Sequence, residues 1–350
     1  MNGRLFALVL VVCVLAAAGT PEAAGVCQVE QTSGAAALTV HLSPDCTDAE
    51  RASKAVAARQ VLTAIKQGQA IDLSGVVIQG DLRLDDLPMT VMPKGLDIES
   101  AGTTGDIRVV SGAVTIVNSV VRGAIRHQSA QGLLVFSGPV DLQGTTFEQP
   151  VDLSRSLFAR PVTLSRAMFL GESYFVQARF LGELFAEQTA FGPHTRFHRT
   201  KFHGPVTFQQ SGFSGLAEFL EVEFRRDANL SRTYFKLGTG FSGSRFHGLA
   251  DFSEALFDRE AFFTFTLFDG DAFFRRATFR RTADFDDARF GARDDFSKVL
   301  FEGESKFARV TRPVNGPAAL GIENPQIQYV ITLSLLLFSA ILIAYLVKSR

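Results

Sequence analysis

The sequence predicts an all-β solenoid, in which a short unit of strand and corner is repeated and each coil of the chain pairs with the next. The first observation is that Phe occupies all 16 positions met in steps of 11 from Phe136 to Phe301. The second is a register from Leu142 to Phe307, where the same steps meet 11 Phe, four Leu and Ala186. Together the two registers use 27 of the 33 Phe residues, which excludes a chance pattern.

A small or β-branched residue stands two positions before almost every register position, as Ala250 does before Phe252 and Val206 before Phe208. Residues two apart in an extended strand point to the same side. Each unit of five or six residues therefore turns one small and one large apolar side chain inward, and then bends at a corner. Stacked coils then bring the rings together in columns, about 4.8 Å apart.

Four stretches show the repeated unit clearly: ADFSE at 250–254, ANLSR at 228–232, ADFDD at 283–287 and VDLSR at 151–155. They resemble the pentapeptide-repeat proteins, whose unit is Ala, then Asp or Asn, then Leu or Phe, then two variable residues. The alternation of five- and six-residue steps is similar to the Phe-rich bacterial branch of that family. The resemblance implies a right-handed, four-sided parallel β-helix.

With four sides, one coil takes two steps of 11 residues, or 22. The regular repeat at 136–311 then forms about eight coils, roughly 38 Å of rod at the strand spacing. Rings 22 residues apart stack in this arrangement. The predicted columns include Phe202, Phe224, Phe246 and Phe268, and the pairs Phe252 with Phe274, Phe257 with Phe279, and Phe263 with Phe285.

Two units depart from the pattern. At Phe185 the ring arrives one residue early and Ala186 takes the register position, which predicts a local bulge. At Asp294 a carboxylate stands where other units place a small inward residue. We expect a distorted turn there, and a functional carboxylate is the alternative.

Residues 1–25 are predicted to be a secretory signal peptide. One Arg precedes the apolar run from Leu5 to Ala18, and small residues with Gly19 and Pro21 follow it. This is the layout of an export signal, and the run is short for a spanning helix. An uncleaved anchor is the alternative.

Residues 26–70 are predicted to form a disulfide segment and a capping helix. Removal of the signal takes Cys13 away and leaves Cys27 and Cys46, which an exporting compartment permits to pair. The two frame ALTVHLSPD, a candidate hairpin. Metal binding by the two cysteines and His41 is the weaker alternative.

The stretch 48–69 has helical spacing at Val56, Leu62 and Ile65, and Gly68 marks its end. A solenoid must cover its open end, so we expect this helix to cap the first coil. Residues 71–135 are β-branched and punctuated by Gly but lack the Phe columns, which predicts irregular coils of the same architecture.

The C-terminal part is predicted to be a Pro/Gly linker at 312–328, a transmembrane helix at 329–347 and a cytoplasmic tail at 348–350. The 19 residues from Tyr329 to Val347 are uncharged and mostly apolar. They reach about 28 Å as a helix, enough to cross a bilayer, and Lys348 and Arg350 favour a cytoplasmic end. A buried helix is the alternative. The prediction is a single-pass protein of the bacterial inner membrane, with its rod in the periplasm or extracellular space.

The charge balance argues against a nucleic-acid partner. The whole chain has a net charge of −1, and residues 136–312 hold 23 Lys and Arg against 23 Asp and Glu. Some cytoplasmic pentapeptide-repeat proteins resemble DNA in shape and charge and bind DNA gyrase, a role that needs a strongly negative surface. Gyrase inhibition by DNA mimicry is therefore the least favoured alternative.

Motifs for chemistry are scarce. The sequence has no phosphate loop, nucleophile elbow or paired-cysteine metal motif, so we expect no cofactor. His194, His198 and His203 come nearest to a metal set. On a β-helix His198 and His203 each follow an inward Phe and diverge onto successive faces, which favours solvated surface histidines.

An acidic cluster offers the first alternative function, a polysaccharide-active or glycan-binding β-helix, because paired carboxylates can act as acid and base on sugars. Its members are Asp284, Asp286, Asp287, Asp294 and Asp295. Arginines lie among them, at Arg275, Arg276, Arg280, Arg281, Arg289 and Arg293. A mixed-charge face that keeps the rod soluble explains both sets.

Phe262, Phe265 and Phe273 lie outside the inward registers. Exposed rings within one coil could form a docking patch for a protein partner or a second copy, and scattered surface rings are the alternative. We therefore expect a non-catalytic, membrane-anchored scaffold or protein-binding module.

Overall fold

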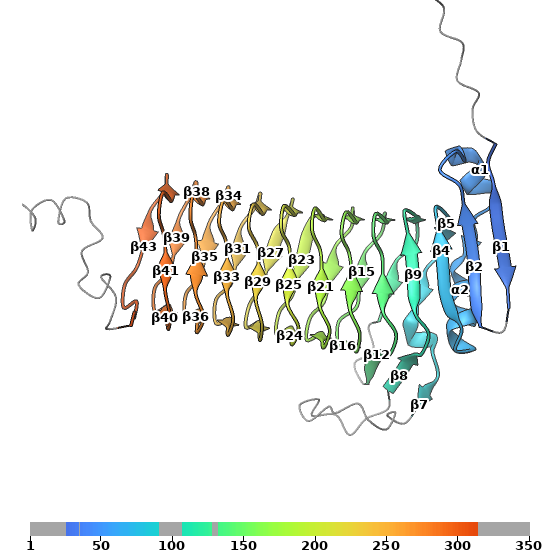
Figure 1. Ribbon diagram of the computed structural model, residues 1–350, viewed down its shortest axis with the longest axis horizontal. Coiled ribbons are helices and arrows are strands. Elements are labelled where there is room, and N and C mark those ends of the chain that lie inside the picture. The colour runs from blue at the N-terminus through green and yellow to red at the C-terminus, as the bar shows by residue number, and fades with distance from the viewer. Residues whose placement is uncertain (1–25, 35, 91–106, 128–131, 314–350) are drawn as a thin grey trace, which may run out of the picture.

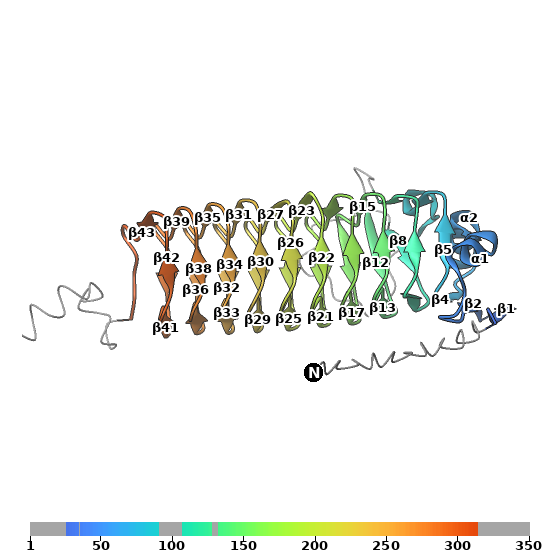
Figure 2. The same cartoon turned by 90° about the horizontal axis from the view of Figure 1, so that it is seen from above.

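The computed structural model describes residues 26–34, 36–90, 107–127 and 132–313. These residues form an elongated rod of stacked coils, as Figures 1 and 2 show. Each coil passes through four sheets in turn, here named sheets A, B, C and D, which have 12, 11, 10 and 10 strands. The predicted solenoid is therefore confirmed, with about ten coils.

Sheets A and B hold the strands that begin each coil. Sheet A contains β1 (Val29–Ser33), β2 (Ala37–Leu42), β4 (Ala70–Ser74), β9 (Val114–Val117), β13 (Val140–Asp141), β17 (Val162–Thr163), β21 (Leu184–Phe185), β25 (Val206–Thr207), β29 (Ala228–Asn229), β33 (Ala250–Asp251), β37 (Ala272–Phe273) and β41 (Asp294–Asp295). Sheet B contains β3 (Val56–Ala57), β5 (Val77–Gln79), β10 (Val120–Val121), β14 (Thr146–Phe147), β18 (Met168–Phe169), β22 (Ala190–Phe191), β26 (Gly212–Phe213), β30 (Tyr234–Phe235), β34 (Leu256–Phe257), β38 (Thr278–Phe279) and β42 (Leu300–Phe301).

Sheets C and D complete each coil. Sheet C contains β6 (Leu82–Arg83), β11 (Ile125–Arg126), β15 (Val151–Asp152), β19 (Ser173–Tyr174), β23 (His194–Arg196), β27 (Leu216–Glu218), β31 (Thr239–Gly240), β35 (Ala261–Phe262), β39 (Ala283–Asp284) and β43 (Ser305–Lys306). Sheet D contains β7 (Met89–Thr90), β8 (Ile107–Val110), β12 (Leu133–Phe136), β16 (Ser156–Phe158), β20 (Arg179–Phe180), β24 (Lys201–Phe202), β28 (Glu223–Phe224), β32 (Arg245–Phe246), β36 (Leu267–Phe268) and β40 (Arg289–Phe290). Sheets A and C lie on opposite sides of the rod, along the lower and upper edges of Figure 2.

The strands pair in parallel with a step of one coil. β33 pairs with β37 so that Ala250 meets Ala272, a step of 22 residues, as the registers predict. Two pairs are antiparallel, β1 with β2 and β7 with β8. The irregular coils before Phe136 join the same four sheets, since β9, β10, β11 and β12 pair with β13, β14, β15 and β16.

From Phe136 onward the core consists mainly of stacked Phe rings, as predicted. The ring centroids of Phe252 and Phe274 lie 5.0 Å apart with an interplanar angle of 2°. All ten predicted column residues have 1% exposure or less. Rings of different columns meet edge to face, as Phe252 and Phe263 do at 89°. In-register parallel strands impose the ring spacing, because each ring sits directly above its counterpart in the previous coil.

The five-residue steps of the repeat correspond to corners with a distinct backbone conformation. The five-residue corners, from sheet A to B and from C to D, contain one residue with positive φ, such as Glu254 at 59° and Phe265 at 56°. This left-handed conformation is costly for residues other than Gly. The Asp or Asn of the repeated unit stabilises the corner, because Asp251 Oδ1 accepts a hydrogen bond from the backbone N of Ser253 at 2.9 Å.

The N-terminal cap differs in one respect from the prediction. Instead of one helix, the chain forms α1 (Asp48–Ser53) and α2 (Ala58–Lys66), separated by β3. The helix is interrupted because Val56 and Ala57 pair with Ile78 and Gln79 and begin sheet B. α2 buries Val61 and Ile65 in the core of the first coil, at the N-terminal end of the rod (Figure 1). A short 3₁₀ helix, η1 (Leu84–Asp86), follows β6.

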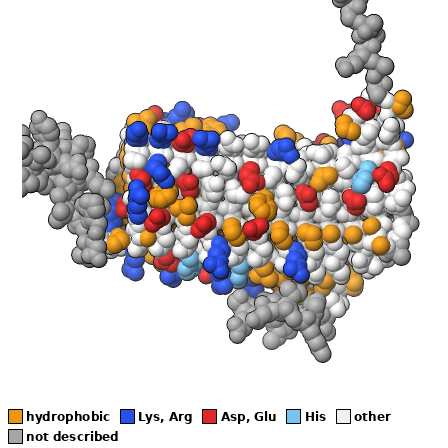
Figure 3. Space-filling view, viewed as in Figure 1, with side chains coloured by type: hydrophobic (Ala, Val, Ile, Leu, Met, Phe, Trp, Pro, Cys, Tyr) orange, Lys and Arg blue, Asp and Glu red, His pale blue; other side chains and the backbone are white. Residues whose placement is uncertain are grey.

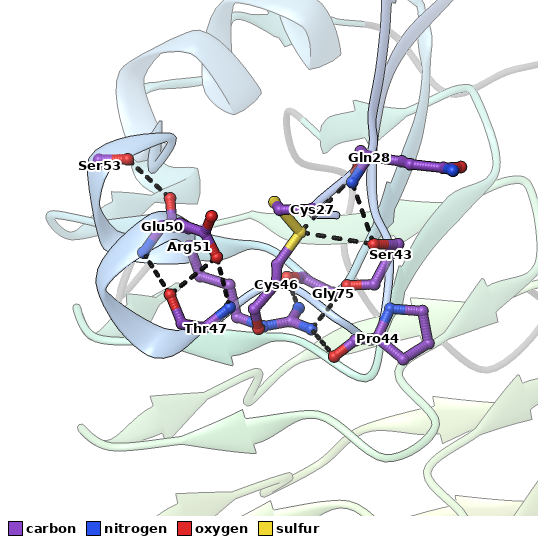
Figure 4. Close-up of a disulfide and its surroundings, with 10 residues drawn as sticks. All are labelled: Cys27, Gln28, Ser43, Pro44, Cys46, Thr47, Glu50, Arg51, Ser53 and Gly75. Carbon is purple, nitrogen blue, oxygen red and sulfur yellow. Dashed lines mark hydrogen bonds between the residues drawn. A yellow bond between two sulfur atoms is a disulfide. The ribbon is translucent and has the colours of Figure 1, made fainter. Parts of the chain in front are cut away.

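The predicted disulfide between Cys27 and Cys46 is present, and the hairpin that it frames is the pair of β1 and β2. Figure 4 shows how Arg51 binds the loop beside it. The guanidinium of Arg51 donates to the carbonyl of Cys46 at 3.0 Å and to that of Ser43 at 2.9 Å, and also to that of Gly75. The disulfide and the guanidinium of Arg51 together hold α1 and β1 to the first coil.

Both predicted departures from the repeat are wrong in detail. The register continues without a bulge at Phe185, since β21 pairs regularly with β17 and β25 and Ala186 takes the buried position. No distorted turn occurs at Asp294 either, since β41 pairs regularly with β37. The Asp294 carboxylate is tolerated near the core because Arg312 Nε lies 2.6 Å from it.

The predicted signal peptide at 1–25 and the predicted membrane helix at 329–347 lie outside the described residues. So does most of the linker, from residue 314 onward. Within the described ranges, no helix combines the length and apolar composition that crossing a membrane requires.

Candidate functional site

The structure separates the three surface rings that the sequence places together. Phe262 points outward from sheet C with 41% exposure, and Phe265 follows at the corner to sheet D with 63%. Phe273 belongs to β37 in sheet A, on the opposite side of the rod. The guanidinium of Arg275 lies 4.1 Å from its ring centroid, which partly covers it. The three rings therefore do not share one surface.

Sheet C places further apolar residues beside Phe262, which the sequence does not predict. The coil before Phe262 has Gly at the two positions that flank the buried Thr239, namely Gly238 and Gly240, and Gly240 is itself buried. A Cβ at Gly240 would lie 3.0 Å from Leu220 Cδ2, and one at Gly238 would lie 3.4 Å from Leu216 Cδ1. The two leucines of the preceding coil therefore lean across the glycines.

The resulting surface is called the sheet C patch. It consists of Leu216, Leu220, Leu237, Gly238, Gly240, Phe262 and Phe265. Leu216 is 39% exposed and Leu237 is 43% exposed. The signal was in the sequence, because the stretch LGTGFSG at 237–243 has Gly where neighbouring coils have side chains. Only the stacking of coils shows that its neighbours are apolar.

Charged rows of opposite sign flank this patch along the rod. On the N-terminal side, β23 presents His194 and Arg196, with His198 after it. Arg196 Nε lies 2.6 Å from a Glu218 carboxylate oxygen, and its guanidinium lies 5.7 Å from the Tyr174 ring centroid. Burial and a hydrogen bond with Glu172 raise the pKa of Tyr174 to about 12, so its hydroxyl stays protonated.

On the C-terminal side, Asp284 and Asp286 lie one coil beyond Phe262. Asp284 Oδ1 accepts a hydrogen bond from the backbone N of Asp286 at 3.0 Å, and Asp286 Oδ1 accepts one from the backbone N of Ala308 at 2.7 Å. Within the described part of the chain, neither carboxylate forms an ion pair. The patch thus lies between a positive row and a negative row.

The acidic cluster does not form a paired-carboxylate site. Asp284 lies in sheet C, whereas Asp294 and Asp295 lie in sheet A on the opposite side. Arg309 binds Asp287 through two hydrogen bonds of 2.6 Å, and these hold the pKa of that carboxyl below its usual range. A general acid needs the opposite shift, so this geometry gives no support to sugar hydrolysis.

Elsewhere the surface is a mixture of charges, as Figure 3 shows for one face. Positions one coil apart often pair, as Arg232 does with Glu254 at 2.9 Å and Arg280 with Asp258 at 2.7 Å. Burial acts to raise the pKa of Asp295. Hydrogen bonds from Ser297 and the charges of Arg275 and Arg293 favour the ionised form and together outweigh burial, so the pKa is lowered. These pairs link neighbouring coils.

The three histidines of the metal hypothesis point to different partners. His194 Nε2 lies 3.2 Å from Glu218, His198 lies 3.8 Å from Glu221, and His203 lies 3.2 Å from Arg225. Burial, followed by the charge of Arg225, lowers the pKa of His203. Among the residues that the structure describes, no group of three His, Cys, Asp or Glu side chains is placed to hold a metal ion.

Two shallow, polar depressions also occur. One of about 560 Å³ is lined by His203, Glu223, Arg225, Arg226 and His247, and one of about 530 Å³ includes Lys236, Asp258 and Arg280. Comparison of the chain with protein families, curated proteins and solved structures found no match. The chemistry of the site is that of an apolar surface between two charged rows.

Proposed function

We propose that this protein is a non-catalytic, membrane-tethered binding module or scaffold, and that its binding surface is the sheet C patch. The observation that supports this most is the exposure of Phe262 and Leu216 on a rod whose other large apolar side chains are mostly stacked inside. Contiguous exposed apolar surface is costly for a soluble protein and marks interaction sites. A stiff rod can present such a surface at a constant geometry.

We also propose that the rod is a right-handed β-helix of the pentapeptide-repeat family. The 22-residue coil, the four sheets and the Asp or Asn that closes a corner after each apolar pair are what a right-handed pentapeptide-repeat β-helix would require. The 11-residue spacing of Phe supports the same assignment. The fold by itself names no ligand, so the function rests on the patch.

The proposed location of the rod is the outer side of the bacterial inner membrane. It rests on the export-like N-terminus and on the 19 uncharged residues from Tyr329 to Val347, which are followed by Lys348 and Arg350. The disulfide between Cys27 and Cys46 supports an oxidising compartment. The rod would then be tethered by its C-terminal end.

Topology is tested by reporter fusions to the full chain. A reporter that works only in the cytoplasm should be active after Arg350, because the positive tail stays inside. The same reporter inserted in the corner at Arg259, an exposed position on the rod, should be inactive. Activity at both positions, or only at Arg259, would contradict the proposed orientation.

The binding surface is tested with a photo-crosslinking phenylalanine analogue in the full-length protein in membranes. At Phe262 we expect a discrete crosslinked product, because this ring projects from the sheet C patch. At Phe273 we expect none, because that ring lies on sheet A beneath Arg275. Equal yields at the two positions would remove the patch as the binding surface.

A further inference from the structure

We infer that the partner of the sheet C patch is a second copy of this chain, packed face to face in the antiparallel direction. This inference rests on the proposed function, since it names the partner of the same surface. Its basis is the order of side chains along sheet C, where every coil contributes one row of three outward positions.

Five consecutive rows on sheet C form the proposed interface. They are His194, Arg196 and His198; Leu216, Glu218 and Leu220; Gly238, Gly240 and Ser242; Glu260, Phe262 and Thr264; and Thr282, Asp284 and Asp286. The first row is basic, the last is acidic, and the central row has almost no side chains. The second and fourth rows supply the exposed apolar groups Leu216 and Phe262.

These rows match under one symmetry operation. A twofold axis that lies between two facing copies, parallel to the strands and above the Gly238–Ser242 row, reverses the rod direction. It places the basic row of each copy over the acidic row of the other, with Arg196 opposite Asp284 and His198 opposite Asp286. Such a contact is self-complementary and closes as a dimer.

The central row is low, because Gly238 and Gly240 have no side chains and Leu216 and Leu220 of the preceding coil lie across them. At the axis Gly240 would face its own copy, with the Leu220 side chain of each rod between them. The protruding rings of Phe262 then reach the row of Leu216 and Leu220 on the other copy. Glu218, which would lie near Phe262, pairs within its own rod with Arg196 at 2.6 Å, and the guanidinium has further N–H groups for Asp284 of the other copy.

The parallel arrangement is disfavoured by the same rows. With both rods running in one direction, each central residue would face its own copy, so Arg196 would meet Arg196, Glu218 would meet Glu218 and Asp284 would meet Asp284. The antiparallel arrangement sets Glu172 opposite Glu304 at the ends of the overlap, where solvent and salt screen the repulsion. It also brings Glu260 beside Glu218, whose charge Arg196 offsets at 2.6 Å. The charge order therefore selects one direction.

The test is a charge swap, measured by sedimentation equilibrium of the full-length protein in detergent. The wild type should show a monomer–dimer equilibrium. Arg196→Glu alone and Asp284→Arg alone should each raise the dimer dissociation constant at least tenfold. The double variant should return it to within about threefold, because the two charges are exchanged across the interface. Lys236→Glu, the same charge change beside sheet B, should leave it unchanged.

A second pair of variants tests the glycine row. Gly240→Gln adds a side chain at the axis and should abolish the dimer, whereas Gly212→Gln fills an open outward position in sheet B and should have no effect. Thermal melts of the charge variants and of Gly212→Gln should overlap with that of the wild type, which excludes unfolding as the cause of any loss. Gly240→Gln displaces Leu220, so a lower melting temperature is expected for this variant alone and the charge swap decides the outcome.

A wild type that stays monomeric at every concentration, single variants without effect, or a double variant as weak as the singles would each overturn the inference. These results leave the proposed function standing if the probe at Phe262 still crosslinks a different protein in membranes. If that probe also gives no more product than the one at Phe273, the binding function fails as well.

Discussion

Replacing Phe252 with Asp is expected to unfold the middle of the rod. The Phe252 ring has 0% exposure, stacks on Phe274 at 5.0 Å, and meets Phe241, Phe246 and Phe263 edge to face. Removing a buried Phe ring costs about 3–5 kcal/mol, and an unpaired buried carboxylate adds to that loss. Urea denaturation should show a loss of about 5 kcal/mol or more in the free energy of unfolding.

Two matched variants make this result specific. Phe252→Leu should cost about 1.5 kcal/mol or less, because Leu230 occupies the same column one coil earlier. Glu254→Lys should cost about 1 kcal/mol, since it loses exposed ion pairs with Arg232 and Arg276. If the Asp variant were as stable as either of these, the stacked core would be wrong.

Removing the disulfide should loosen the N-terminal cap. Cys27 and Cys46 are 19 residues apart, and closing a loop of this size contributes about 3 kcal/mol. Cys27→Ser combined with Cys46→Ser should therefore lower the stability of the cap by about that amount. Hydrogen exchange should show faster exchange in β1, β2 and α1, while the Phe coils stay protected, because coils contact mainly their neighbours.

The control for the cap experiment is Cys13→Ser, which should leave both the exchange pattern and the sensitivity to reducing agents unchanged. Arg51→Ala offers an independent check, because it removes the hydrogen bonds to Cys46 and Ser43 while the disulfide stays intact. Protection of β1 and β2 that is the same with and without the disulfide would show that the bridge does not hold the cap.

The inward half of this protein was predictable because it depends on local rules. A ring that recurs every 11 residues must occupy equivalent positions, and the alternation of small and large residues sets which side of the strand is buried. The same arithmetic could have separated Phe262 from Phe273, since 11 residues are half of a 22-residue coil and so lead to the opposite side. Their proximity in the chain, on which the predicted docking patch depends, does not reflect their positions on the rod.

The cap shows where local pattern was insufficient. The helical spacing from 48 to 69 is continuous, yet Val56 and Ala57 leave the helix to pair with Ile78 and Gln79. Their backbone N–H and C=O groups pair with a strand about twenty residues further along the chain. Helix propensity depends on nearby residues and does not take such a distant partner into account. The same holds for Arg312, which balances Asp294 from the next coil.

The amino-acid sequence by itself determined the coil, its corners and its column of rings, because every repeat carries the side chains that its own strand and corner require. Only the tertiary structure decided which outward residues become neighbours, because a face is assembled from residues a full coil apart. That is how Leu216, two glycines and Phe262 form one surface between a basic and an acidic row, while the carboxylates of the acidic cluster are divided between opposite sides.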